Sequence, residues 1–83
     1  MKIITKDLFE ASYLMAKGMH LQDVHSDRKT VLFQFEGKDE LGVLKSKFVK
    51  GRAEVNLRRF RNSMNHLRDI LFDRIKQEKP AAK

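Results

Sequence analysis

Near the C-terminus, apolar residues recur in steps of three and four positions, which is the period of an amphipathic α-helix. The residues of this series are Leu57, Phe60, Met64, Leu67 and Leu71, and Ile75 extends it. Asn56 precedes the series and is a favourable N-cap residue. We therefore predict a helix of about five turns that ends near Gln77. In a chain of 83 residues the other elements must cover the apolar face of this helix.

Residues 6–17 contain no helix breaker and predict an earlier helix. Thr5 is expected to cap it, and Asp7 and Glu10 lie in its first turn, where the helix dipole favours acids. Gly18 suits the position just beyond its end. A broad buried face is expected from Leu8, Phe9, Ala11, Ser12, Tyr13, Met15 and Ala16.

Between His20 and Glu36 the apolar period changes to two, which predicts a β-hairpin with a polar turn at residues 26–29. In the second strand, Val31, Phe33 and Phe35 alternate. In the first strand the expected pattern is Leu21, Asp23 and His25 on one face, with Gln22 and Val24 on the other. Because an isolated hairpin is marginally stable, it must be covered by helices, extended by another strand or paired with a second copy of the chain.

A further helix is expected to begin at Lys38 or Asp39 and to run to about Lys50, with Gly51 closing it. Its inner face is marked by Leu41, Leu44 and Phe48. Residues 52–55 are expected to form a short connector, with an additional edge strand as the alternative.

The predicted fold class is therefore α+β, in a small single domain with the order α-β-β-α-(β)-α. An antiparallel hairpin packs against helices, and a long C-terminal helix ends the domain. Residues 1–76 are expected to form this compact domain, and residues 77–83 a flexible basic tail.

Positive charge is concentrated in the second half of the chain. Residues 1–42 contain 6 Lys/Arg and 7 Asp/Glu, a net charge of −1, whereas residues 43–83 contain 12 and 4, a net charge of +8. This asymmetry predicts a polyanionic partner: nucleic acid, an acidic protein surface or an anionic membrane.

The predicted last helix carries a second line of residues beside its apolar face, which we call the arginine ridge. Its members are Arg58, Arg61, Asn65, Arg68, Phe72 and Lys76. Arginine binds phosphate through a planar fork of donors, asparagine can contact a base edge, and phenylalanine can stack on a base. The ridge therefore predicts a nucleic-acid-binding surface. The alternative is an ordinary solvated helix face, with Asp69 and Asp73 paired to neighbouring arginines.

A second group of cations, the lysine cluster, lies at the end of the predicted second helix. It comprises Lys45, Lys47, Lys50 and Arg52. Cations at a helix C-terminus are also favoured by the dipole, so the cluster has a structural explanation as well as a binding one. If it lies beside the arginine ridge, the two make one large basic patch.

Several classes of site are not expected. The chain has no cysteine, which excludes disulfides and thiolate metal sites. No two of its three histidines are three or four positions apart, as a helical pair of metal ligands requires, and no glycine-rich phosphate loop is present. We therefore predict no metal, no cofactor and no enzymatic activity. With no long apolar run and an early charged N-terminus, a cytoplasmic protein is expected.

Segments from both ends of the chain resemble a family of small uncharacterised bacterial and phage proteins, a domain of unknown function. The similar segments are residues 5–8, 11–14, 16–18, 31–35 and 55–60, within a match that spans about residues 3–72. The resemblance implies a compact single domain in a bacterial or mobile-element setting, and it supplies no catalytic or binding residues. Proline follows the asparagine in similar proteins, whereas Leu57 follows Asn56 here, which leaves the capping argument intact.

The leading functional hypothesis is a small nucleic-acid-binding or regulatory protein, with DNA favoured over RNA and a homodimer as one arrangement. The alternative is a protein-interaction module, such as a phage- or plasmid-type regulator or inhibitor that docks on an acidic partner. A third hypothesis is a homo-oligomer whose hairpin completes a sheet across chains. Membrane binding is not expected, because the core needs the apolar face of the last helix.

Overall fold

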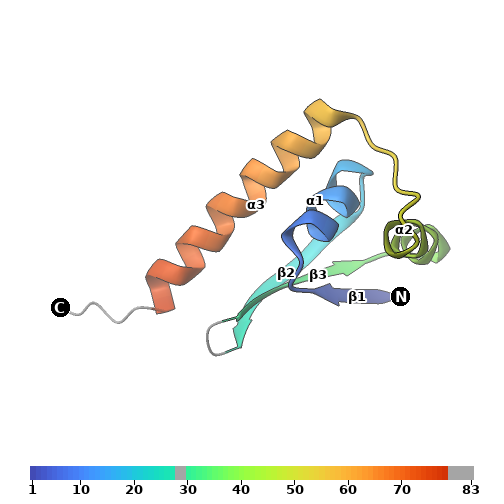
Figure 1. The fold of residues 1–83 in the computed structure, drawn as a ribbon. Coiled ribbons are helices and arrows are strands. Elements are labelled where there is room, and N and C mark those ends of the chain that lie inside the picture. Colours follow the sequence, from blue (N-terminus) through green and yellow to red (C-terminus); the bar gives the residue numbers. More distant parts are fainter. Residues whose placement is uncertain (28–29, 79–83) are drawn as a thin grey trace.

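The computed structural model describes residues 1–27 and 30–78 and has an α+β fold (Figure 1). The elements in chain order are β1 (Lys2–Thr5), α1 (Leu8–Ala16), β2 (His20–Asp27), β3 (Thr30–Glu36), α2 (Asp39–Val49) and α3 (Leu57–Glu78). The predicted hairpin, the helices around it and the long last helix are confirmed. Residues 77 and 78 belong to α3, and the remainder of the predicted tail, residues 79–83, lies outside the described residues.

A third strand, β1, completes the sheet and was not predicted. It pairs antiparallel with β3, so that the strand order is β1-β3-β2, with Ile3 opposite Phe35 and Thr5 opposite Phe33. Residues 52–55, the optional strand, form no strand. The Lys-Ile-Ile-Thr sequence suits an edge strand because Ile3 and Thr5 alternate into the core while Lys2 is exposed. The hairpin therefore gains its extra strand from its own chain.

The faces predicted for β2 are wrong, because the strand contains a register shift at Gln22. Leu21 pairs with Phe35, but the next pair in register is Asp23 with Gln34, so one residue is extra. Such a bulge switches the face of every residue that follows it. Leu21 and Val24 consequently both pack against the core. The side chain of Gln22 instead bonds Glu36 and Gln34 on the exposed face.

The first helix begins two residues later than predicted, at Leu8. Asp7 is its N-cap, and its Oδ1 accepts hydrogen bonds from the backbone N–H groups of Phe9 at 2.9 Å and Glu10 at 3.3 Å. Thr5 is the last residue of β1, and its hydroxyl oxygen accepts a bond from the backbone N–H of Asp7 at 3.0 Å. The capping function predicted for Thr5 thus belongs to Asp7, because pairing with β3 holds Thr5 in the sheet.

Both of the shorter helices end as predicted, at Gly18 and Gly51. Each glycine has a positive φ, 89° and 74° respectively. The backbone N–H of Met19 donates to the carbonyl of Leu14, and that of Arg52 to the carbonyl of Lys47. A hydrogen bond from a backbone N–H to the carbonyl five positions earlier is characteristic of the Schellman motif, in which the chain turns directly after the helix.

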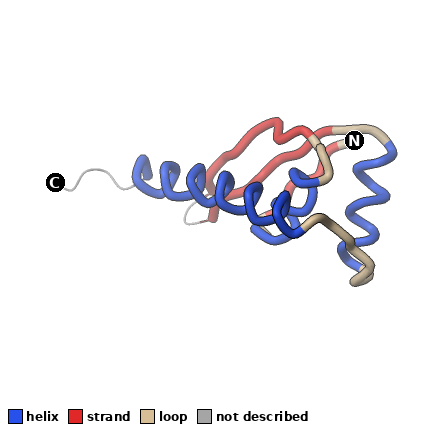
Figure 2. Tube along the Cα trace, turned by 90° about the horizontal axis from the view of Figure 1, so that it is seen from above, coloured by secondary structure: helices blue, strands red, loops and turns tan. Residues whose placement is uncertain are grey.

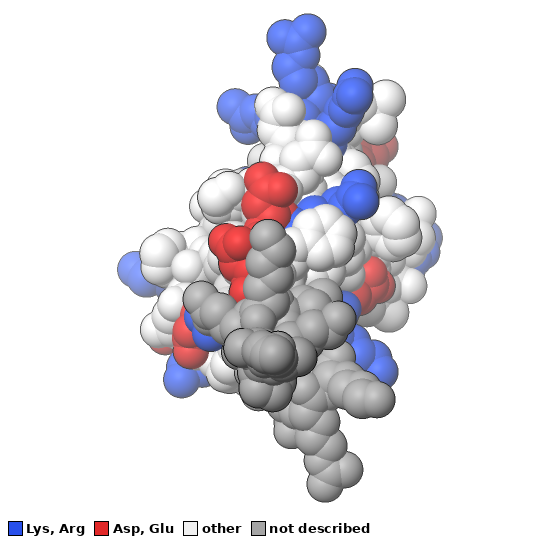
Figure 3. All heavy atoms as spheres, turned by 90° about the vertical axis from the view of Figure 1, so that its left-hand side faces the viewer, with Lys and Arg blue, Asp and Glu red and all other residues white. Residues whose placement is uncertain are grey.

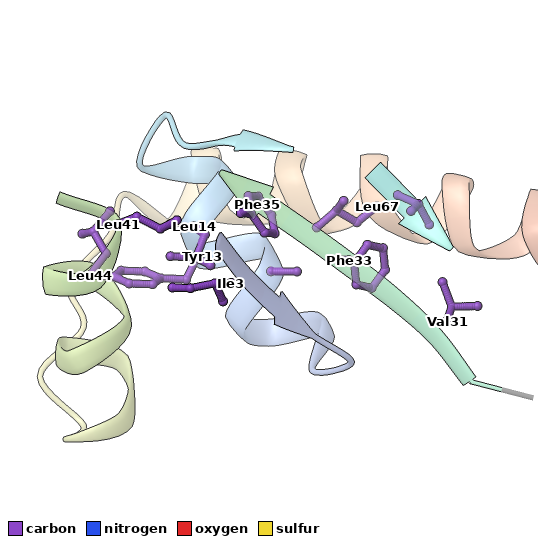
Figure 4. Packing of buried hydrophobic residues seen from close by; sticks show 11 residues of the cluster. Ile3, Tyr13, Leu14, Val31, Phe33, Phe35, Leu41, Leu44 and Leu67 are labelled. Atoms are coloured by element: carbon purple, nitrogen blue, oxygen red, sulfur yellow. The ribbon is translucent and has the colours of Figure 1, made fainter. Parts of the chain in front are cut away.

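Helix α1 lies in the middle of the domain and packs against α2, α3 and β1. Because it has neighbours on several sides, five successive residues, Glu10 to Leu14, are buried, so its buried positions do not follow a single helical stripe. The core seen in Figure 4 joins this helix to the inner face of the sheet and to the two later helices. Its largest buried side chains are Tyr13, Leu14, Phe33, Phe35, Leu41 and Leu67.

Helix α3 runs alongside the strands, and its C-terminal end points away from α2 (Figure 2). Asn56 caps it as predicted, with its Oδ1 accepting from the backbone N–H of Arg59 at 3.0 Å. Leu67 is fully buried in the core, but Leu57, the first member of the predicted apolar face, is 81% exposed. Phe60, one turn later, stacks with Phe9 of α1, whereas Leu57 itself remains exposed.

Candidate nucleic-acid interface

The arginine ridge lies on the outer face of α3. Arg58, Arg61, Asn65 and Arg68 are all exposed, and Phe72 is 49% exposed. Residues three and four apart are neighbours on a helix, so these side chains form a continuous line. The side chain of Lys76, the last predicted member, lies outside the described residues.

The arginines of this ridge are not neutralised by the nearby acids. Among residues 1–26 and 30–74, whose side chains the structure describes, no carboxylate lies at ion-pair distance from Arg58, Arg61 or Arg68. Figure 3 shows basic side chains gathered at the top, where Figure 1 places the N-terminal end of α3, with acidic side chains grouped below them. Asp69 and Asp73 therefore form no ion pairs with these arginines that would weaken their positive potential.

The C-terminal end of the ridge combines a cation with an aromatic ring. The guanidinium carbon of Arg68 lies 5.9 Å from the centroid of the Phe72 ring, a cation–π distance. The Phe72 ring is half exposed. Arg68 contacts the ring and leaves part of its surface free for a further contact.

The N-terminal end of the ridge borders a shallow surface hollow of about 580 Å³. Its lining is Leu57, Arg58, Arg61, Asn62 and Asn65. The hollow thus offers two guanidinium groups and two amides beside one exposed aliphatic side chain. Sequence reasoning missed the contribution of Leu57, because the helical period assigned it to the core.

An aromatic pair of the exposed Phe9 and the partly buried Phe60 lies next to the same end of α3. The rings of Phe9 and Phe60 are stacked, with centroids 6.5 Å apart and planes inclined by 11°. Phe9 was expected in the buried face of α1 but is 59% exposed. The sequence carries no clear signal for this, because α1 is buried on several sides and its apolar residues follow no single stripe.

The members of the lysine cluster do not form one continuous binding surface. The Nζ of Lys45 lies 2.7 Å from Oε2 of the buried Glu10 and so serves an internal ion pair. Lys47, Lys50 and Arg52 are exposed and line a separate hollow of about 510 Å³ on α2, together with Met1, Asp39, Gly42, Val43 and Ser46. This hollow shares no residue with the hollow on α3, so the two cationic groups do not line a common depression.

One buried polar group stands apart from these surfaces. The Tyr13 hydroxyl is buried without a hydrogen-bond partner among the described residues. Burial raises the pKa of this phenol above 10.0, and the negative charge of Glu54 raises it further. Tyr13 packs on Phe48 at a centroid distance of 5.8 Å, which places it in the interface of α1 with α2. Its position is that of a core residue.

Among the side chains described in residues 1–26 and 30–74, no group of three or more His, Asp or Glu is arranged to hold a metal ion. None of the helices described there is both long and apolar enough to cross a bilayer.

Comparison with curated proteins and with solved structures finds no match to this chain. One family model, described as a domain of unknown function (DUF5659), matches residues 1–73. That range runs from β1 through most of α3 and includes the ridge as far as Phe72. The expected resemblance to an uncharacterised domain family is thereby confirmed, and the chain belongs to the DUF5659 family.

Proposed function

We propose that this protein is a small nucleic-acid-binding protein of regulatory type that contacts phosphates through the arginine ridge of α3. One observation supports this above all: Arg58, Arg61 and Arg68 are exposed along one helix face with no described carboxylate at ion-pair distance. Unpaired guanidinium groups on a rigid helix create a positive potential and offer bidentate donors to phosphate oxygens. The proposed activity is binding without catalysis and without a cofactor.

The charge at the start of α3 supports the same conclusion. The first turn contains no acid and includes Arg58 and Arg59, although the positive end of a helix dipole disfavours cations. Positions at which a sequence breaks a local rule are often functional, because the stability lost there is tolerated for another purpose. An anionic ligand would relieve this repulsion.

The proposal is tested by fluorescence anisotropy with labelled duplex and single-stranded oligonucleotides, first at low salt and then with increasing salt. We expect log K to fall linearly with log salt concentration, with a slope of about −2 to −3 if three arginines each neutralise one phosphate. Arg61→Ala combined with Arg68→Ala should weaken binding and reduce the magnitude of this slope by about 1.5.

A charge-matched control is available on α2. Lys47→Ala combined with Lys50→Ala removes the same charge from the other hollow, so it should leave the salt slope close to that of the wild type. Absence of binding to every oligonucleotide at low salt contradicts the proposal, and so does an equal effect of the two double variants.

A second candidate function is protein interaction, and the hollow on α2 favours it. There Val43, which is exposed, lies among Lys47, Lys50 and Arg52. An aliphatic side chain surrounded by cations suits an acidic protein segment with an apolar anchor, as in a phage- or plasmid-type regulator or inhibitor. A stoichiometric partner captured from nuclease-treated lysate by the wild type, and lost with Lys47→Glu/Lys50→Glu, would support this function.

A further inference from the structure

The arginine ridge is bordered differently on its two sides. On one side runs a parallel row of exposed residues, Asn62, His66, Asp69 and Asp73, which ends in two carboxylates. On the other side lie exposed apolar groups, because Leu57 is one turn before Arg61 and the Phe9–Phe60 pair stacks at the same end. A ligand of the ridge therefore meets negative charge on one flank and apolar surface on the other.

We infer that the ligand of this surface is a single strand of nucleic acid, with its phosphates along the arginines and its bases turned toward the aromatic and aliphatic groups. This inference rests on the proposed function and narrows it to one class of ligand. A single strand has one backbone, so it can follow the cationic line and avoid the acidic row. Its unpaired bases expose both faces for stacking.

A duplex fits the same surface poorly. A helix that enters the major groove, about 12 Å wide, has a phosphate backbone on each side of it. One backbone would lie near Arg61 and Arg68, but the other would approach Asp69 and Asp73. The Debye length is about 8 Å at physiological salt, so this repulsion is felt within the groove.

The apolar groups are placed to receive bases at both ends of the ridge. Phe72 is half exposed, and Arg68 lies against it at a cation–π distance. Phe9 is exposed beside Phe60 with the two rings nearly parallel, as in an offset stack. Phe60 and Phe72 are 12 positions apart, which corresponds to about 18 Å along a helix. This length separates the two aromatic positions by several nucleotides, with the arginines between them.

The experiment compares three labelled probes under one low-salt condition: an oligothymidine, an oligouridine of the same length and a DNA duplex of that length. We expect both single strands to bind more tightly than the duplex. The tighter of the two single strands identifies DNA or RNA as the source of the ligand. Phe72→Leu, which keeps apolar bulk but removes the aromatic ring, should weaken single-strand binding about fivefold or more and leave duplex binding nearly unchanged.

A second variant tests the acidic row directly. Asp69→Asn combined with Asp73→Asn should strengthen duplex binding more than single-strand binding. The difference in affinity between single strand and duplex should therefore become smaller. Val49→Ala, an exposed change on α2, is the control for nonspecific effects, and circular dichroism verifies the fold of each variant.

The possible failures are distinguishable. Duplex binding as tight as or tighter than both single strands overturns this inference while the proposed function stands. Single-strand binding that Phe72→Leu leaves unchanged also overturns it. If none of the three probes binds, the proposed function fails and the inference fails with it.

Discussion

The Nζ of Lys45 on α2 lies 2.7 Å from Oε2 of Glu10 on α1, and Glu10 is only 4% exposed. The two residues are 35 positions apart in the chain, so this pair links two helices that are distant in sequence. A buried carboxylate that loses its counter-ion is strongly unfavourable, whereas the pair as a whole is not necessarily stabilising. Although the Lys45 side chain is 40% exposed, this contact commits its charge to Glu10.

Lys45→Met is expected to lower the free energy of unfolding by about 2 kcal/mol, because it leaves the Glu10 carboxylate without its partner. Glu10→Gln combined with Lys45→Met should recover most of that loss, since no charge then remains buried. Urea denaturation of the three proteins measures both effects. A Lys45→Met variant as stable as the wild type would show that water already solvates the Glu10 carboxylate.

Tyr13→Phe is expected to raise the free energy of unfolding by about 1 kcal/mol near neutral pH, because the hydroxyl is buried without a partner. The same variant should change the response to alkali. Since the pKa of Tyr13 in the folded state lies above the ordinary value of 10.0, the folded protein holds this proton more tightly than the unfolded chain. The corresponding stability is fully present below about pH 10 and is lost as the pH rises toward the folded-state pKa.

Denaturation of wild type and Tyr13→Phe above and below about pH 10 isolates this contribution, because the lysines titrate equally in both proteins. Tyr13 is the only tyrosine, so the tyrosinate absorbance of the wild type reports its pKa without overlap. A titration midpoint at or below 10 in the folded protein would refute the effect of burial.

Leu57→Ala and Leu67→Ala form a matched pair on one helix. Leu67 is fully buried, so its truncation should cost about 2–4 kcal/mol through lost burial and the cavity that remains. Leu57 is 81% exposed, so the same change should shift stability by less than about 0.5 kcal/mol. Thermal or urea unfolding distinguishes the two, and similar losses would mean that Leu57 is covered in solution.

Gly51→Ala is expected to destabilise the protein by about 1 kcal/mol, because the residue has a φ of 74° and a side chain there is strained even though the space is open. Gly51→Asn is the control, since asparagine tolerates the left-handed region better than alanine. We expect the denaturation midpoints to rank wild type, asparagine, then alanine. An alanine variant as stable as the wild type would indicate that the Schellman motif is not maintained.

Local features of the fold were predictable from the sequence for local reasons. The alternation of Val31, Phe33 and Phe35 predicted a strand with one buried face, and the structure buries all three. Gly18 and Gly51 predicted helix ends, because few other residues adopt a positive φ without strain. Asn56 predicted the start of α3 through a hydrogen bond that spans only three residues.

The line of the arginine ridge was likewise predictable, because residues three and four apart share a helix face whatever surrounds the helix. The absence of ion pairs between its arginines and the carboxylates that the structure describes was not predictable. Asp69 and Asp73 are close to the arginines in sequence, and only the orientation of the side chains decides whether they pair.

Sequence alone thus determined the helices, the hairpin, the helix ends and the line of arginines, since each depends on interactions within a few residues. Tertiary structure decided the rest. Pairing with β3 made residues 2–5 a strand, the extra residue at Gln22 changed which side of β2 is buried, and the position of α1 left Leu57 uncovered. The contact of Lys45 with Glu10 removed one cation from the predicted surface. Each of these outcomes depends on which distant segments come together, and periodicity along the chain carries no information about that.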